Sequence, residues 1–157
     1  MPRIFLSHDS RSKPVAVAFK ELLTRDEPDV QVFLSSDWDS IEAGSQWLEA
    51  VLSSLRACDT FAAIISATVE SMNPWIHFEV GYVMALERKP KIFIFGSVNW
   101  QQIPFPLKAV HLIDTGDTNR WVTELERIGV RSVRNKIDDF AGLFRQNRDS
   151  QGNAHNS

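Results

Sequence analysis

The residues most able to do chemistry stand close together in the segment NPWIHFE, residues 73–79. Glu79 follows Trp75 by four positions. Residues four apart share one face of a helix, so we expect the ring and the carboxylate to be neighbours. The rest of this predicted helix is apolar on nearly every face. A carboxylate in such surroundings is either satisfied by a nearby donor, in a structural role, or poised for chemistry.

The number of carboxylates on this helix limits the reactions it can support. Glu87 lies two turns beyond Glu79, at the exposed end, so no second carboxylate shares the face. Hydrolysis of an ordinary glycoside needs an acid for the leaving group, and a single carboxylate fits that reaction poorly. It fits better with an N-glycosidic bond whose leaving group is already cationic, such as nicotinamide in NAD. One glutamate could then hold the ribose hydroxyls and stabilise oxocarbenium-like charge.

The elements that must position Glu79 can be predicted from the apolar pattern. Asn73 is a good N-cap, Pro74 suits the first helical position, and the sequence RKP at residues 88–90 predicts the helix end. Strand-like runs and helical patterns alternate along the rest of the chain. We predict strands at residues 3–7, 30–34, 60–66, 91–96 and 110–114. The other predicted helices cover residues 13–24, a segment around 47–55, and 121–128.

The predicted strands are apolar on both faces, which is typical of a parallel sheet covered by helices on both sides. We therefore expect an α/β fold, a flavodoxin-like three-layer sandwich with a five-stranded parallel sheet. Ligands of such sheets bind beyond the carboxyl ends of the strands, where the strand order reverses. Ser7 and His8, the sequence SSD at residues 35–37, Ser66 and the start of the Glu79 helix all fall at that edge.

Length and composition describe one ordinary globular domain. The chain has 157 residues, of which 43% are hydrophobic and 24% charged, enough for a sizeable core. Its net charge of −3 and lack of a basic run argue against nucleic-acid binding. With Cys58 as the single cysteine and no metal-spaced Cys/His set, we expect neither disulfide nor metal. We expect no signal peptide, no membrane span and a cytoplasmic location.

The end of the chain has a different pattern. Apolar residues step by three and four along a charged helix, and they form a narrow stripe. This stripe consists of Val130, Val133, Ile137, Phe140 and Phe144. We predict a domain at residues 1–129, an amphipathic helix at 130–146 and a polar, disordered tail at 147–157. The helix either packs on the domain or docks a partner or a second copy.

Four sequence segments together resemble a bacterial TIR (Toll/interleukin-1 receptor) domain. They are IFLSHDSRSK at residues 4–13, FLSSDWDSIEAGSQW at 33–47, FAAIIS at 61–66 and WIHFE at 75–79. The similarity spans residues 3–128, and its four motifs stand in the right order on the right elements. The last segment is similar to the WxxxE motif of NAD-consuming TIR domains. The resemblance implies that Glu79 is the catalytic carboxylate and Trp75 its supporting aromatic residue.

The resemblance also implies a set of substrate-binding residues. Ser7 and His8 would border the pocket for nicotinamide and ribose. Ser36, Asp37 and Trp38 would lie on the mobile loop that shapes NAD access and mediates assembly in this family. NAD would be the substrate, and no cofactor or metal would be needed.

Each of these residues also has a structural interpretation. Trp75 could be a core residue, because buried tryptophan is mainly packing. His8 could be a turn residue that caps the next helix, and Asp37 could start a turn. Trp47 on its apolar helix is predicted to be core, and His77, on another face, is not expected to be catalytic.

The expected function is cleavage of the nicotinamide–ribose bond of NAD, as in the signal-producing subunits of antiphage systems such as Thoeris. Attack by water would give ADP-ribose, attack by the substrate's own adenine a cyclic product, and another nucleophile a conjugate. The resemblance further implies self-association through TIR–TIR contacts and a separate effector that responds to the product. A non-catalytic interaction module is the alternative, although such domains generally lack the WxxxE glutamate. A nucleoside 2-deoxyribosyltransferase is the third reading, which the loop at residues 33–47 disfavours.

Overall fold

A five-stranded parallel sheet forms the centre of the molecule. The computed structural model describes residues 1–8, 10–35, 44–65, 74–95, 101, 103, 107 and 110–140. The strands are β1 (Arg3–His8), β2 (Gln31–Leu34), β3 (Thr60–Ile65), β4 (Lys91–Ile94) and β5 (His111–Asp114). Their order is β2-β1-β3-β4-β5, and every neighbouring pair is parallel. This is the flavodoxin-like order, which confirms the predicted fold class.

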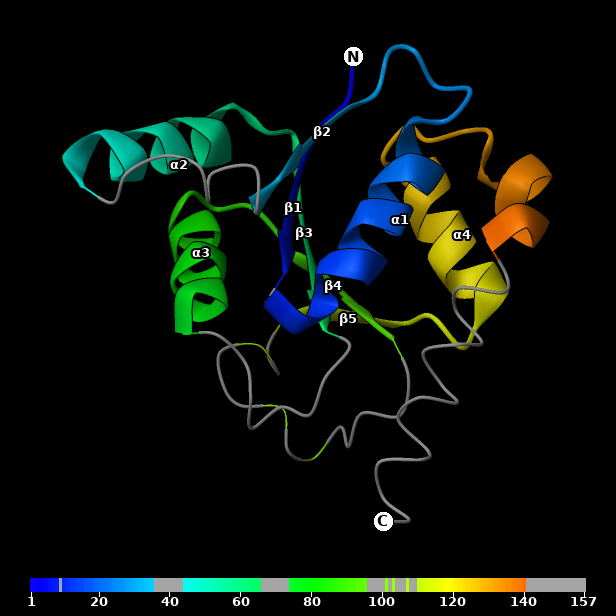
Figure 1. Ribbon diagram of the computed structural model, residues 1–157. Helices are drawn as coiled ribbons and strands as arrows, with labels where there is room; N and C mark the ends of the chain where they lie inside the picture. Colours follow the sequence, from blue (N-terminus) through cyan, green and yellow to red (C-terminus); the bar gives the residue numbers. More distant parts are fainter. Residues whose placement is uncertain are drawn as a thin grey trace.

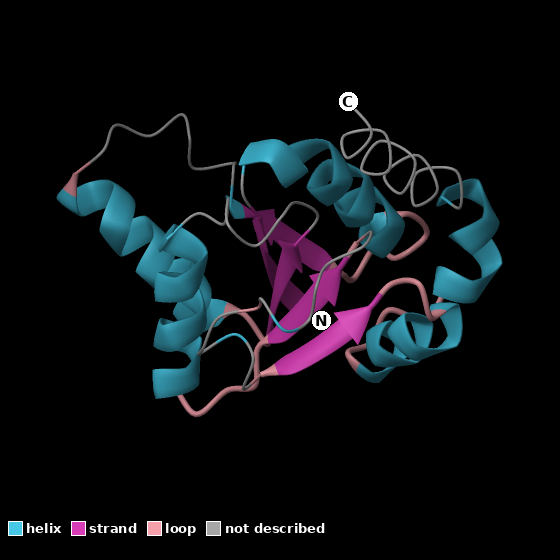
Figure 2. Ribbon diagram, turned by 90° about the horizontal axis from the view of Figure 1, so that it is seen from below, coloured by secondary structure: helices cyan, strands magenta, loops and turns pink. Residues whose placement is uncertain are grey.

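Helices cover both faces of the sheet. They are α1 (Lys13–Thr24), α2 (Ser45–Ala57), α3 (Pro74–Ala85) and α4 (Thr118–Arg127), with a 3-10 turn η1 (Ser10–Ser12) before α1. A further helical segment covers residues 133–140. α1 and α4 lie on one side of the strands, and α2 and α3 lie on the other (Figure 1, Figure 2). The three layers are those expected of a parallel sheet with both faces buried.

Each face of the sheet carries its own apolar core, because side chains alternate between faces along a strand. On β1, Ile4 and Leu6 join the core under α1 and α4, whereas Phe5 joins the core under α2 and α3. On β3, Ile64 and Ile65 divide between the two cores in the same way. The position of a residue in its strand therefore decides which helix layer it meets.

Several details of the predicted strands and helices differ from those of the structure. β1 continues through His8, one residue beyond the predicted end. β2 is exposed at alternate positions, including Phe33, and so departs from the prediction that the strands are apolar and buried on both faces. β2 is the edge strand of the sheet, with a neighbour on one side only. α4 begins at Thr118, before the predicted start, because the side chain of Asp117 accepts a hydrogen bond from the Arg120 N–H as an N-cap.

The helix that carries Glu79 begins at Pro74, as predicted, while Asn73 lies outside the described residues. The helix ends in a Schellman motif with Glu87 in the left-handed conformation at φ 59°. The Glu87 N–H donates to the Met84 carbonyl, and the Arg88 N–H donates to the Val83 carbonyl. The RKP sequence therefore follows a defined helix end rather than causing it alone.

The apolar stripe after residue 129 contacts the rest of the domain. Val130, Val133 and Phe140 are buried in the core under α1 and α4, and Ile137 packs against it. Phe144 lies outside the described residues, and the predicted division at residues 129 and 146 stays a prediction. Within the described part of the chain, no helix combines the length and apolarity that a membrane crossing requires.

Candidate active site

The candidate site lies at the carboxyl ends of β1 and β3, where the strand order reverses. Ser7 and His8 end β1, and they stand beside Ala63 and Ile64 of β3 in the parallel register. The backbone N–H of His8 donates to the Ser35 hydroxyl at 3.2 Å, at the end of β2. Ligands of doubly wound sheets bind at this switch point, so the strand order by itself points to this edge.

Glu79 is the central residue of the candidate site. It lies in the second turn of α3 and its side chain has no exposed surface. Among the described residues, neither carboxyl oxygen takes part in a hydrogen bond of regular geometry, and the same holds for the hydroxyl of Ser7. Buried polar groups are nearly always hydrogen-bonded, so two adjacent exceptions mark a place where a ligand could supply the partners.

Burial controls the protonation of Glu79. It raises the pKa of this carboxyl to about 8, while the Ser7 hydroxyl and the Trp75 side chain oppose the rise. Both groups are therefore close enough to stabilise the ionised form, although neither makes a hydrogen bond of regular geometry to it. A carboxyl with this pKa is mainly protonated at pH 7, and a nearby positive charge would favour its ionisation.

A column of aromatic side chains borders the site. The Trp75 ring centroid lies 4.7 Å from that of Trp47 on α2 and 4.7 Å from that of Phe78 on α3. Phe78 stacks in turn on Tyr82, with centroids 6.3 Å apart, and the Tyr82 hydroxyl accepts a hydrogen bond from Arg56 Nε at 2.8 Å. Trp75 is thus the residue that links the buried carboxyl to the partly exposed surface between α2 and α3.

The structure brings together some of the residues singled out in the sequence. Ser7, Trp75 and Glu79 meet, and His8 follows directly on β1. Ser36, Asp37, Trp38 and Ser66 lie outside the described residues. His77 is partly buried on the same helix as Glu79, and it contributes nothing to the shifted pKa of that residue.

Trp47, which is predicted to be a core residue, packs against the core under α2 and α3 without being fully enclosed by it. Its side chain is only partly buried, and its ring contacts Trp75 beside the candidate site. The sequence places Ser35 at a strand end but does not predict its contact with His8. Both contacts join elements that are distant along the chain. The only available signal was that the first turns of two successive helices each carry a tryptophan.

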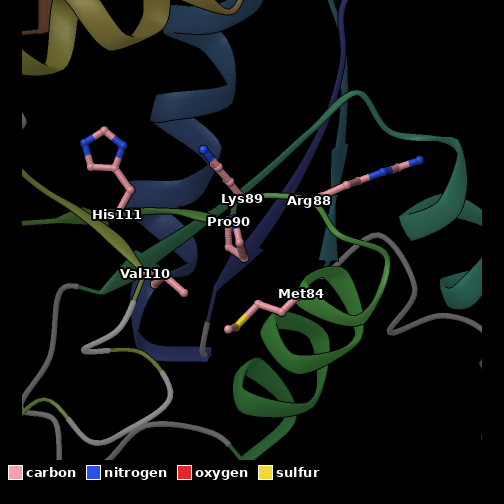
Figure 3. Close-up of a pocket in the computed structure, with 6 residues that line it drawn as sticks. All are labelled: Met84, Arg88, Lys89, Pro90, Val110 and His111. Atoms are coloured by element: carbon pink, nitrogen blue, oxygen red, sulfur yellow. The ribbon is translucent and has the colours of Figure 1, made fainter.

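Two further features help to delimit the site. No group of three or more metal-ligating side chains gathers anywhere in the part of the chain that is described. A cavity of about 240 Å³ lies at the opposite, amino-terminal edge of the sheet, before β4 and β5 (Figure 3). It is lined by Met84, Arg88, Lys89, Pro90, Val110 and His111. None of these residues belongs to the candidate site, and Arg88 turns away from the cavity toward α2.

Comparisons with known proteins identify structures with a similar fold and the family of the chain. The search of curated proteins found no match. Among solved structures, the chain is similar to the CMP N-glycosidase BcmB of Clostridium botulinum, with 20% identity and a TM-score of 0.51. That likeness covers 79% of this chain and 98% of the other, and at this identity it shows a shared fold alone.

A 2-deoxyribosyltransferase from Leishmania mexicana is similar at 18% identity and a TM-score of 0.47. That match covers 62% of this chain and 67% of the other, and it is too distant to support an argument. The sequence profile of the TIR domain, in contrast, matches residues 4–128 and so includes nearly the whole sheet, helices α1 to α4 and the candidate site. The chain therefore belongs to the TIR domain family.

Proposed function

We propose that this protein cleaves the bond between nicotinamide and ribose in NAD, with Glu79 as the catalytic carboxylate. The observation that carries the proposal is the state of Glu79. The residue is wholly buried at the switch point of the sheet, beside the Ser7 hydroxyl, and its oxygens make no regular hydrogen bond to the described residues. Two hydroxyls of a ribose would supply the hydrogen bonds that this carboxyl lacks.

The proposed mechanism uses the charge of the substrate. A nicotinamide cation beside Glu79 would lower the pKa of the carboxyl and favour its ionised form. The carboxylate would then accept hydrogen bonds from the ribose hydroxyls and stabilise the positive charge that develops on the ribose. The bond between the ribose carbon and the nicotinamide nitrogen breaks, and its electron pair stays with nicotinamide. The leaving group becomes neutral without a proton, so no second acid is required.

Membership of the TIR family supports a TIR-type function, and it agrees with several finer proposals. Ser7, His8 and Trp75 would border the nicotinamide and ribose, while Ser36, Asp37 and Trp38 would shape access for NAD. We further propose self-association through TIR–TIR contacts. The ADP-ribose-derived product, cyclic or conjugated, would act as a signal in antiphage defence and be recognised by a separate effector.

Two alternatives differ in what Glu79 does. In a non-catalytic interaction module, Glu79 would be a buried structural residue, and NAD would not be consumed. In an enzyme of the deoxyribosyltransferase type, Glu79 would act on a nucleoside. The pKa of about 8 favours chemistry over a purely structural role, because an unpaired buried carboxyl destabilises the fold above neutral pH.

The test is incubation of the full-length chain with NAD at high protein concentration, with products separated by chromatography and weighed by mass spectrometry. We expect release of nicotinamide by the wild type and its loss in Glu79→Gln, with Glu87→Gln, just beyond the carboxyl end of the same helix, as the matched control. Unchanged NAD would favour the interaction module. Loss of NAD that persists in Glu79→Gln would overturn the mechanism. Cleavage of a 2′-deoxynucleoside in place of NAD would favour an enzyme of the deoxyribosyltransferase type.

A further inference from the structure

The aromatic column between α2 and α3 fixes the surroundings of Trp75 from both helices. Trp47, in the first turn of α2, contacts Trp75 with a tilt of 41° between the rings. Phe78, one turn further along α3, stacks on Trp75 at 26°. The hydrogen bond from Arg56 to Tyr82 ties the other end of the column to α2. The contact with Trp47 is thus the point where α2 reaches the residue that neighbours Glu79.

We propose that Trp47 is a positioning residue for the candidate site: its ring holds the Trp75 side chain against the carboxyl group of Glu79. Trp75 is only partly buried, and Phe78 is 43% exposed, so α3 alone does not enclose the indole. The indole N–H is a donor only, and it stabilises a carboxylate only where the ring is correctly oriented. A contact from a second helix supplies that orientation, because tertiary packing restricts the two side-chain torsions of tryptophan.

No charged group competes with Trp75 for control of Glu79 among the described residues. Burial, Ser7 and Trp75 are the three causes that act on the pKa of Glu79. Besides Glu79, the titratable and charged groups on α3, β1 and α2 are His77 and Tyr82 on α3, Arg3 and His8 on β1, and Glu49 and Arg56 on α2. None of them changes the pKa of Glu79, so a loosened Trp75 should be visible in that value.

The experiment measures the pKa of Glu79 directly, by carbon NMR of the labelled carboxyl in the substrate-free, full-length protein. Trp47→Leu removes the ring contact, and Trp75→Phe keeps a ring at position 75 but removes the N–H. We expect each change to raise the pKa of Glu79, because each weakens a donor to the ionised form. The double variant should show no larger shift than Trp75→Phe, because both changes act through one contact.

Two further variants separate positioning from stability. Leu52→Ala removes packing from the same helix and core, and it should leave the pKa of Glu79 unchanged while the protein becomes less stable. Trp47→Phe keeps a smaller ring in contact with Trp75. In this variant, the pKa of Glu79 should lie between the values in wild type and in Trp47→Leu. If Trp47→Leu does not fold, Trp47→Phe takes its place. Its effect on the pKa of Glu79 is then compared in the wild type and in the Trp75→Phe variant.

The catalytic consequence rests on the proposed function and is measured separately. With NAD as substrate, Trp47→Leu should lower kcat/KM by about tenfold and move the acid limb of its pH profile to higher pH. A wild type that leaves NAD intact would overturn the proposed function, while the NMR titration still decides the role of Trp47. An unchanged pKa in Trp47→Leu, or an undiminished shift when Trp75 is already Phe, would overturn the positioning role.

Discussion

At the scale of single residues, the site depends on a carboxyl group that burial keeps neutral. Glu79 has no exposed surface, and the oxygen atoms of its carboxyl make no regular hydrogen bond to described residues. Its pKa of about 8 means that most molecules hold this proton at pH 7. A cationic substrate would lower this pKa, so under the proposed function the substrate itself would produce the ionised, catalytic form of Glu79.

The raised pKa of Glu79 predicts how stability varies with pH. The folded protein binds this proton more tightly than the unfolded chain, whose glutamate titrates near 4.5. The contribution to stability is therefore complete below pH 4.5 and is lost as pH rises through about 8. Glu79→Gln removes this dependence. As pH rises from 5 to 9, its free energy of unfolding should therefore increase relative to that of wild type by roughly 3 to 5 kcal/mol.

Urea unfolding of both proteins at several pH values measures this difference. Glu87→Gln is the control, because Glu87 is exposed at the end of the same helix. A free energy of unfolding that changes with pH in parallel for wild type and Glu79→Gln would contradict the raised pKa.

Ser7 should influence the same carboxyl from β1. Its buried hydroxyl lowers the pKa of Glu79, so Ser7→Ala should raise that pKa further. Under the proposed function, kcat/KM for NAD at pH 7 should fall by about tenfold to a hundredfold, with partial recovery at higher pH. Ser7→Thr, which retains the hydroxyl, serves as the comparison. Equal loss at every pH would indicate that Ser7 acts by another route.

The proximity of Trp75 and Glu79 was predictable, because helical spacing fixes which residues share a face. The meeting of Glu79 with Ser7 followed from the rule that parallel strands end at one edge. The pairing of Trp47 with Trp75 was not predictable in this way. It depends on the distance and rotation between two helices, which the local sequence pattern does not contain.

At the scale of elements, side-chain contacts join α3 to α2. Arg88, the last residue of the Schellman motif, donates from its side chain to the carbonyl groups of Leu55, Arg56 and Cys58 at the end of α2. The last carbonyls of a helix have no partner within it, so the guanidinium satisfies groups that would otherwise need water. This contact and the Trp47 contact together hold α2 and α3 near both ends.

Replacement of this guanidinium should destabilise the protein. Arg88→Met keeps most of the side-chain stem but removes the donors, and it should lower the free energy of unfolding by about 2 kcal/mol. Lys89→Met is the matched control, since Lys89 is exposed and adjacent. Thermal or urea unfolding measures both changes. Equal effects of the two substitutions would show that charge, rather than the contact with α2, is responsible.

Most elements could be predicted because their apolar runs match the burial of a two-sided parallel sheet. The start of α4 was missed because its first turn, TNR, is polar, and only the capping residue Asp117 indicates it. The exposed face of β2 was missed because an apolar residue such as Phe33 has the same appearance in an edge strand as in a central one. Local sequence does not identify which strand will be the edge.

At the scale of the whole molecule, the segment after α4 is fastened to the turn between α1 and β2. Glu27 accepts hydrogen bonds at 2.6 Å from the backbone N–H groups of Arg131 and Ser132, just before the helical segment 133–140. Lys136 is 3% exposed and donates to the Arg25 carbonyl. The Arg25 guanidinium lies 4.8 Å from the centre of the Phe140 ring. These contacts make the segment part of the folded domain.

Loss of the Glu27 carboxylate should loosen this segment. Burial alone would raise the pKa of Glu27, but the hydrogen bonds from Ser132 and Arg131 lower it on balance. Its stabilising effect is therefore present above the usual carboxyl pKa and is lost as pH falls through the lowered value. Glu27→Ala should lower the free energy of unfolding by about 1 to 2 kcal/mol at pH 7.

Hydrogen exchange of the amides at residues 131–140 locates the effect of this change. Protection should fall there in Glu27→Ala, while the exposed Glu21→Gln, which removes an ion pair with Arg25, should leave it unchanged. A uniform loss of protection over the whole domain would contradict a local role for Glu27.

The proposed function depends on all three scales, because the edge of the sheet, helices α2 and α3, and the buried carboxyl of Glu79 meet at the candidate site. The most direct test is the rate at which nicotinamide is released from NAD by wild type, Glu79→Gln and Glu87→Gln, each shown to be folded. We predict that Glu79→Gln slows release by about a thousandfold or more and that Glu87→Gln stays within about twofold of wild type. Release by Glu79→Gln within about tenfold of wild type would contradict a catalytic role for this carboxylate.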